Sequence, residues 1–267
     1  MTDGKKVIFL DIDGTLSWNS LPPCQADIDA LRRARAAGHY VFINTGRANG
    51  FMPAPLRGVD YLDGYLCGCG TQLLMGGRQI FGDELKRPFL RRVAAFHLAR
   101  PDRVCLFEAE DALYGIHAPA EVYHTLPVLR EDAFEQAYAH VHVTKVTVLG
   151  HGRATTDEHA LFDGELELVE QSQSNWYEAI LPGNGKGRGM ERTCRILGVP
   201  IENSIAIGDS ENDLDMFAHA GAAVAMENAS PLALEAAHYI TGRCGEGGVS
   251  QAVHALVFGE GKIIKRK

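Results

Sequence analysis

Short apolar runs, each followed by a polar turn, recur near both ends of this 267-residue chain. The run at residues 7–10 leads into Asp-Ile-Asp-Gly-Thr, the run at 40–43 leads into Asn-Thr-Gly-Arg, and the run at 205–207 leads into Gly-Asp-Ser-Glu-Asn-Asp. Segments with helical spacing lie between them, such as residues 24–38. Continuous apolar strands that alternate with helices are typical of a parallel sheet covered on both faces. We therefore predict an α/β core.

The middle of the chain has a different pattern. From about Glu84 to Pro182, a helix-like segment precedes several short segments of alternating polar and apolar residues. This mixture predicts an α+β domain with an antiparallel sheet, inserted into the parallel-sheet core. The glycine-rich stretches around Gly76–Gly77 and at residues 182–189 are the expected hinges between the two domains.

Charge and composition restrict the possible partners. A formal net charge of -8 argues against nucleic-acid or membrane binding, because a phosphate backbone requires clustered Lys and Arg. No run approaches the roughly 20 apolar residues needed to cross a bilayer. Six cysteines are too dilute for a disulfide scaffold in a chain this long. We therefore expect a cytoplasmic protein with free thiols, a small-molecule partner, and a monomeric or weakly dimeric state.

Two aspartates follow the first apolar run. Because side chains alternate along a strand, Asp11 and Asp13 are expected to project in similar directions. Two like charges held together require a proton or a cation, and Mg²⁺ suits oxygen ligands. Gly14 allows a sharp turn, and Thr15 with the N–H groups of the turn can bind an anion. In the alternative interpretation, the two aspartates only begin a loop and cap the next helix.

Two further features supply groups that bind phosphate. Thr45 follows the second apolar run, where its hydroxyl and the N–H of Gly46 can bind a phosphoryl oxygen, although Thr45 could also be a helix N-cap. Lys186 lies among glycines that allow close approach of the backbone, and its compact positive charge suits phosphate. A solvated loop lysine is the alternative.

The third apolar run is followed by Asp209, Asn212 and Asp213. Asp209 can complete a metal site, whereas Asn212 and Asp213 can orient the ligands and water around it. A solvated acidic loop is the alternative. All these polar groups follow apolar runs, and ligands of parallel α/β sheets bind beyond the carboxyl ends of the strands.

Together, the segments 11–15 (DIDGT), 45–47 (TGR), the glycine-flanked Lys186 and 208–213 (GDSEND) resemble, in the same order, the four motifs of the haloacid dehalogenase-like (HAD) superfamily. The last motif and the mixed insert resemble Cof-type phosphatases with a type-IIB cap. The resemblance implies a Rossmann-like core at residues 1–83 and 183–267 and an inserted α+β cap (type C2B) at residues 84–182.

The resemblance also implies roles for individual residues. Asp11 would be the nucleophile that becomes an aspartyl phosphate. Asp13 would be the general acid and base, with its backbone carbonyl on Mg²⁺, and Asp209 would be the remaining carboxylate on the metal. Thr45 and Lys186 would hold the transferring phosphoryl group, which agrees with a reaction that requires positioning and charge neutralisation.

One position departs from the family pattern, and the cap offers few candidate contacts. Cys69 precedes Gly70 where Cof-type members usually have Asn-Gly, which puts the contact of that asparagine in doubt. Trp176 and Glu178 could contact a sugar, although a place in the cap core is the favoured interpretation of Trp176. Arg47 could position a substrate anion or pair with a carboxylate.

The first hypothesis is therefore a Mg²⁺-dependent phosphatase that acts on a small phosphorylated metabolite, above all a sugar phosphate. The second is a phosphotransferase like the phosphomannomutases, which use the same aspartate pair. The third is a catalytically silent protein that binds phosphorylated ligands. The presence of both a nucleophile and an acid/base counts against the third hypothesis.

Overall fold

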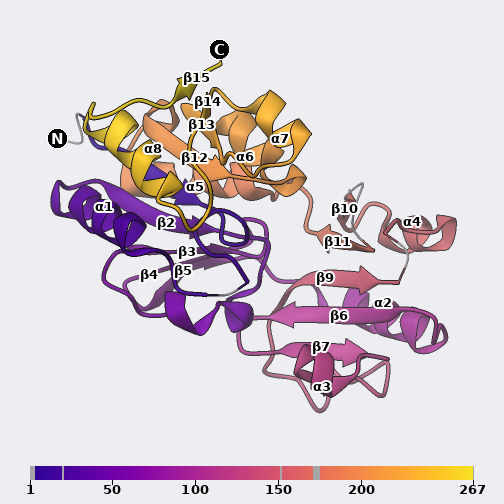
Figure 1. The fold of residues 1–267 in the computed structure, drawn as a ribbon. Coiled ribbons are helices and arrows are strands. Elements are labelled where there is room, and N and C mark those ends of the chain that lie inside the picture. Colours follow the sequence, from indigo (N-terminus) through magenta and orange to yellow (C-terminus); the bar gives the residue numbers. More distant parts are fainter. Residues whose placement is uncertain (1–3, 20, 151, 171–174, 267) are drawn as a thin grey trace. The chain divides into compact units, whose positions relative to one another are not determined.

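The computed structural model describes residues 4–19, 21–150, 152–170 and 175–266 (Figure 1). Contacts divide the chain into two compact units. Unit 1 consists of Met1–Gly46, Met52–Ile80 and Gly185–Lys267, and unit 2 consists of Arg47–Phe51 and Phe81–Asn184. No helix in the described part of the chain is long and apolar enough to span a membrane.

Unit 1 is built on a nine-stranded sheet with the order β15-β14-β13-β12-β1-β2-β3-β4-β5, whose last strand continues into unit 2. The strands from β14 to β3 pair in parallel, and β15 and β4 pair antiparallel to their neighbours. The strands are β1 (Val7–Leu10), β2 (Tyr40–Asn44), β3 (Gly64–Cys67), β4 (Gln72–Met75), β5 (Arg78–Gly82), β12 (Ser204–Gly208), β13 (Ala222–Ala225), β14 (Tyr239–Ile240) and β15 (Ile264–Lys265).

The apolar strands of unit 1 are buried on both faces, as their continuous hydrophobicity predicts. Ile8 and Leu10 of β1 belong to a core cluster that includes side chains of the packed helices α1 and α8. Phe9, which points to the other face, stacks on Phe42 with ring centroids 5.8 Å apart. The helices of this unit are α1 (Gln25–Ala36), α5 (Lys186–Leu197), α6 (Leu214–His219), α7 (Pro231–Ala236) and α8 (Gly248–Val257).

Gly76–Gly77 forms a tight turn between β4 and β5, which are neighbours in the sheet. Their φ values of 58° and 73° belong to the left-handed region that such two-residue hairpin turns require. The expected hinge at this position is therefore wrong. The long stretch of unit 2 begins after Ile80 instead, and it ends at Asn184, within the glycine-rich stretch 182–189.

Unit 2 contains a six-stranded sheet with the order β10-β11-β9-β6-β7-β8, in which only the β7–β8 pair is parallel among the described pairings. One core cluster joins this sheet to helix α2 (Arg87–Leu98). The predicted α/β class, with a parallel-sheet core and an α+β insert, is confirmed. The remaining elements are β6 (Val104–Ala109), β7 (Leu113–Ile116), α3 (Ala120–Tyr123), β8 (Thr125–Pro127), β9 (Val143–Leu149), α4 (Thr156–Phe162), β10 (Glu167–Glu170) and β11 (Trp176–Ile180).

His97 of α2 is completely buried, and neither ring nitrogen has a hydrogen-bond partner among the described residues. Burial lowers the pKa of His97 to about 4, although Glu158 opposes this effect. The folded chain therefore keeps the imidazole neutral under conditions in which the unfolded chain, with a histidine pKa near 6.5, binds a proton. Stability must then fall as the pH drops from about 6.5 towards 4.

We expect this proton linkage to lower the free energy of unfolding by about 1.4 kcal/mol between pH 7.5 and pH 5.5. His97→Leu removes the ionisable group, so its stability should decline less over the same range. Urea unfolding of both proteins at the two pH values measures the difference. Parallel pH profiles for the two proteins would contradict a neutral, buried His97.

Candidate active site

Three adjacent parallel strands deliver the candidate residues to one edge of the unit 1 sheet. Asp11 directly follows the last residue of β1, Thr45 that of β2 and Asp209 that of β12. Leu10 is in register with Ile43 on one side and Ile207 on the other, so the carboxyl ends of the three strands lie side by side. The Asp11 N–H continues this pairing by donating to the Ile207 carbonyl at 3.0 Å.

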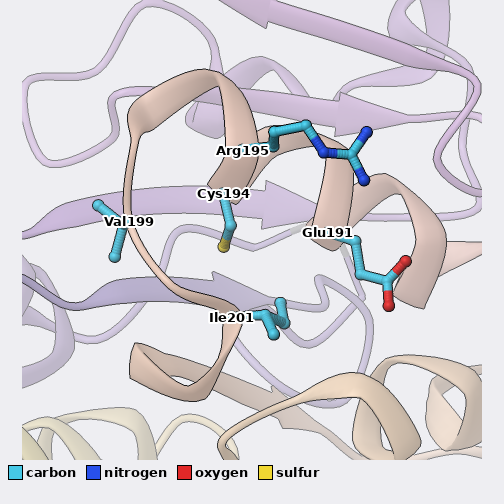
Figure 2. A pocket seen from close by; sticks show the side chains of 5 residues that line it. All are labelled: Glu191, Cys194, Arg195, Val199 and Ile201. Carbon is cyan, nitrogen blue, oxygen red and sulfur yellow. The ribbon is translucent and has the colours of Figure 1, made fainter.

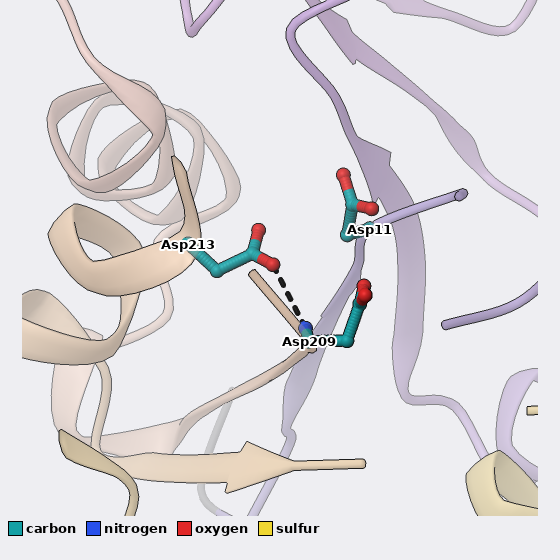
Figure 3. Close-up of side chains that lie close together, drawn as sticks. All are labelled: Asp11, Asp209 and Asp213. Atoms are coloured by element: carbon teal, nitrogen blue, oxygen red, sulfur yellow. Dashed lines mark hydrogen bonds between the residues drawn. The ribbon is translucent and has the colours of Figure 1, made fainter. Parts of the chain in front are cut away.

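An acidic cluster occupies this edge. Asp11, Asp209 and Asp213 each offer a carboxylate oxygen, and these oxygens lie within 4.8 Å of one another (Figure 3). Asp11 is 5% exposed and Asp213 is completely buried. Asp213 accepts the N–H groups of Asp209 and Ser210 with one oxygen, at 2.9 and 3.0 Å. Asp213 thereby fixes the loop that carries Asp209.

Lys186 supplies the positive charge in this cluster. It is the first residue of α5 and is 2% exposed. Its Nζ donates to Asp11 Oδ1 at 2.7 Å, to Asp213 Oδ1 at 2.6 Å and to Asn212 Oδ1 at 3.0 Å. Ser210 Oγ also donates to Asn212 Oδ1, at 2.9 Å. The structure therefore brings together the predicted Lys186, Asn212 and Asp213 around the Asp11 carboxylate.

The charges in the cluster do not balance. Burial raises the pKa of Asp11 to about 6, although Lys186 opposes this effect. Burial, with repulsion from Asp11 and Asp213, raises the pKa of Asp209 to about 7. Burial alone would lower the pKa of Lys186, but the Asp11 and Asp213 carboxylates outweigh it and raise that pKa above the ordinary value. Three ionised carboxylates beside one ammonium leave two negative charges for a cation or protons to offset.

The donor set fits a hard divalent cation, because it consists of carboxylate oxygens that carry an excess charge of two. Both Asp213 oxygens already accept hydrogen bonds, from Lys186 and from backbone N–H groups. Asp209 Oδ1 accepts only the Thr15 hydroxyl, at 2.8 Å, among the bonds described. Asp11 and Asp209 are therefore the carboxylates best able to hold Mg²⁺. The Asp13 side chain, by contrast, is exposed.

The turn after Asp13 requires glycine for two reasons. Gly14 has a φ of 87°, and a Cβ there would lie 2.3 Å from Asp209 Oδ2.

Asn228 holds this turn through its side chain. The Gly14 carbonyl accepts the Asn228 side-chain amide at 2.8 Å, and Asn228 Oδ1 accepts the Cys244 N–H at 2.8 Å. Asn228 thus holds the turn against the loop that follows β13. Nothing in the local sequence around Asn228 indicates this role.

Asn44 is a second residue that the sequence reasoning missed. It is buried at the end of β2, and its amide donates to the Lys186 carbonyl at 3.1 Å. This bond ties the strand that leads to Thr45 to the first residue of α5. The signal that could have revealed it is an asparagine that directly continues an apolar strand, because a buried amide requires a partner.

Cys69, the residue that departs from the family pattern, adopts a left-handed conformation with a φ of 53°. Its N–H donates to the Thr45 carbonyl at 3.1 Å, so its backbone lies beside a predicted phosphate-binding residue. Asparagine tolerates this conformation better than other residues with a β-carbon. The left-handed backbone conformation therefore explains in part why asparagine is usual at this position.

We expect Cys69→Asn to stabilise the protein by about 0.5–1 kcal/mol, because the substitution relieves strain in the left-handed region. Cys69→Ala is the matched control, since alanine loses the thiol but keeps the unfavourable conformation. Chemical unfolding of the three proteins measures the effect. If the asparagine variant is no more stable than the alanine variant, the strain at residue 69 has no measurable cost.

The predicted substrate contacts Arg47, Trp176 and Glu178 all lie in unit 2. Trp176 is 36% exposed, and it lies outside the core cluster of that unit, so the cap-core interpretation of this residue is wrong. Glu178 is buried and forms an ion pair with Lys145. The Arg47 guanidinium donates to the Phe51 carbonyl at 3.4 Å. Thr45 and Gly46, by contrast, belong to unit 1 with the acidic cluster.

A separate surface hollow of about 290 Å³ lies along α5 and the turn after it (Figure 2). Its lining includes Cys194, and burial raises the pKa of that thiol to about 12. The thiol therefore remains protonated at neutral pH and is a poor nucleophile. The hollow includes none of the predicted catalytic residues; its lining consists of Glu191, Cys194, Arg195, Val199 and Ile201.

Several known proteins resemble this chain over nearly its whole length. The family model described as haloacid dehalogenase-like hydrolase matches residues 8–253. The putative phosphatase YxeH of Bacillus subtilis is 39% identical over 269 residues, covering 94% of this chain and 98% of the relative. The pyridoxal phosphate phosphatase YbhA of Escherichia coli is 25% identical over 266 residues, covering 94% and 98%.

A structure of the HAD subclass IIB sugar phosphatase BT4131 aligns with a TM-score of 0.77 and 26% identity, covering 96% of this chain and 99% of that one. The chain spans only 46% of another relative, a chloroplastic endoribonuclease of Arabidopsis thaliana, with 27% identity. The family match covers nearly the whole chain, and the fold and the relatives agree with it. This chain therefore belongs to the haloacid dehalogenase-like hydrolases, as an enzyme of the phosphoric monoester hydrolase class.

Proposed function

We propose that this enzyme is a Mg²⁺-dependent phosphatase that hydrolyses a small phosphorylated metabolite, above all a sugar phosphate, through an aspartyl-phosphate intermediate. The observation that carries the proposal is the convergence of Asp11, Asp209 and Lys186 in one partly buried cluster of unit 1. A carboxylate held beside an ammonium and an excess of negative charge suit a metal-assisted nucleophile.

In the first step, a carboxylate oxygen of Asp11 attacks phosphorus, and the bond between phosphorus and the leaving alcohol oxygen breaks. Lys186 Nζ contacts Asp11 Oδ1 at 2.7 Å, so Oδ2 is the oxygen left for attack. Asp13 donates a proton to the leaving oxygen. Its exposed side chain can reach a group outside the buried cluster.

In the second step, water attacks phosphorus, and the bond to Asp11 breaks. Asp13, now ionised, accepts a proton from that water, so inorganic phosphate leaves and both aspartates are restored. Thr45 and Gly46 would hold phosphoryl oxygens during both steps. Mg²⁺, bound by Asp11, the Asp13 carbonyl and Asp209, would neutralise charge on the phosphoryl oxygens.

Removal of divalent cations should abolish phosphate release, and added Mg²⁺ should restore it. Mg²⁺ should also raise the thermal unfolding temperature, because a cation bound to the native state offsets repulsion between Asp11 and Asp209. Asp209→Asn should lose this thermal shift, whereas the exposed-site variant Asp29→Asn should keep it. Full activity after exhaustive metal removal would exclude the metal from the reaction.

The substrate class rests on the relatives. One is a sugar phosphatase and another a pyridoxal phosphate phosphatase, so both sugar and cofactor phosphates belong in a substrate screen. Phosphate release should be highest among the sugar phosphates. Formation of an isomerised sugar phosphate without free phosphate would instead identify a phosphotransferase. Efficient hydrolysis confined to cofactor phosphates would overturn the proposed substrate class.

A further inference from the structure

The segment Arg47–Phe51 begins directly after Thr45 and Gly46, but it belongs to unit 2. Two hydrogen bonds connect this segment to unit 2, one from its backbone and one from a side chain. The Ala48 N–H donates to Glu108 Oε2 at 3.2 Å, and the Asn49 side-chain amide donates to the Glu110 carbonyl at 3.3 Å. At Gly50 a Cβ would lie 3.2 Å from the Ala112 nitrogen, so the backbone also packs closely there.

Glu108 lies on the face of the unit 2 sheet opposite the core. Its neighbours in β6, Phe107 and Ala109, belong to the core cluster, and alternation along the strand turns Glu108 the other way. Glu108 is nevertheless only 7% exposed. A buried carboxylate is costly unless it is paired, so we expect the Glu108 carboxylate to have specific partners.

Lys145 and Thr147 hold the other oxygen of Glu108. Lys145, directly opposite on β9, places its Nζ 3.0 Å from Glu108 Oε1, and the Thr147 hydroxyl donates to the same oxygen. Lys145 also forms an ion pair with Glu178 on β11. Two side chains of β9 thus hold one oxygen of the Glu108 carboxylate, and its second oxygen accepts the Ala48 N–H.

We propose that Glu108 is a positioning residue for the phosphoryl-binding residues Thr45 and Gly46. A hydrogen bond from a backbone N–H to a carboxylate is stronger than one to a neutral acceptor, so Glu108 fixes the backbone three residues after Thr45. Displacement of phosphoryl-binding groups by about 1 Å can reduce the rate about a hundredfold. The inference rests on the proposed function, because Thr45 and Gly46 matter only if they bind the phosphoryl group.

Glu108→Gln tests this role. Glutamine keeps the size of the side chain but removes the charge that strengthens the bond to Ala48. Hydrolysis of p-nitrophenyl phosphate should lose about tenfold or more in kcat/KM, and the inhibition constant for inorganic phosphate should rise about tenfold. Hydrogen exchange of the amides in residues 46–51 should also become faster.

Glu158→Gln is the matched control. Glu158 is a buried carboxylate of the same unit, where it lies on α4 and pairs with Arg103 at 3.2 Å. This variant should lose stability but keep kcat/KM, phosphate inhibition and exchange in residues 46–51. Equal losses in both variants would show that Glu108 has only a structural role and would overturn the proposal. A normal phosphate inhibition constant in Glu108→Gln would also overturn it.

Asn49→Ala keeps the test decisive if Glu108→Gln does not fold. It removes the bond to Glu110 and should raise the inhibition constant for phosphate, by a smaller factor than Glu108→Gln does. An unchanged inhibition constant would contradict the role of this segment.

Direct phosphate titration separates the inference from the proposed function. A wild-type chain that hydrolyses no phosphomonoester, yet binds phosphate more tightly than Glu108→Gln, would refute the function and support the positioning role.

Discussion

Asp11→Asn is expected to reduce phosphate release by roughly a thousandfold or more while the fold remains intact. The amide is nearly isosteric with the carboxylate but is a poor nucleophile, so no phosphoryl-enzyme can form. The neutral side chain also removes one of the like charges that raise the pKa of Asp209. The variant should therefore be no less stable than the wild type in the absence of metal. Phosphate release and thermal unfolding measure the two effects.

Asp29→Asn is the control for this substitution, because Asp29 is an exposed aspartate on α1 whose carboxylate contacts only other exposed side chains in the described bonds. It should leave turnover within about twofold of the wild type. Normal turnover by a folded Asp11→Asn protein would remove Asp11 from the reaction. A second carboxylate, such as Asp13 or Asp209, would then have to be tested as the nucleophile.

Lys186→Met is expected to have the largest effect on stability. The substitution removes the ammonium that contacts Asp11 and Asp213, and it leaves their carboxylates buried with like charge. Breaking a buried ion pair in this way costs about 3–5 kcal/mol. Phosphate release should also be lost, since Lys186 both orients Asp11 and is a predicted ligand of the phosphoryl group. Chemical unfolding and turnover measure these outcomes.

The double variant Lys186→Met with Asp11→Asn separates the charge effect from the loss of packing. If repulsion is the main cost, the double variant should be more stable than Lys186→Met alone, because one of the unpaired carboxylates is now neutral. Lys262→Met, in the exposed C-terminal segment, should change neither stability nor turnover. Strict additivity of the two substitutions would contradict a direct interaction between Lys186 and Asp11.

The core of the site was predictable because its residues follow apolar runs. Asp11, Thr45 and Asp209 each come within two residues of the end of a continuous apolar run, and parallel strands place such ends at one edge. Lys186 was predictable only as one member of the motif set. Its three acceptors come from two separate parts of the chain, and local sequence does not show how those parts pack.

Other features could not be predicted, because they depend on contacts between distant segments. Nothing in the sequence around Arg47–Phe51 indicates that this segment packs with the inserted unit. Asn228 contacts Gly14 across 214 positions of sequence. The glycine pattern at Gly76–Gly77 predicts a hinge, although the conformation of this pair is that of a hairpin turn, which has the same glycine requirement.

The central claim is that Asp11 carries the phosphoryl group during turnover. Rapid acid quenching of the enzyme during hydrolysis of p-nitrophenyl phosphate, followed by peptide mass spectrometry, tests it most directly. The account predicts one phosphorylated peptide, which contains residue 11 and is missing from the Asp11→Asn protein. Phosphorylation confined to another residue, or steady turnover with no phosphorylated peptide at any quench time, would contradict it.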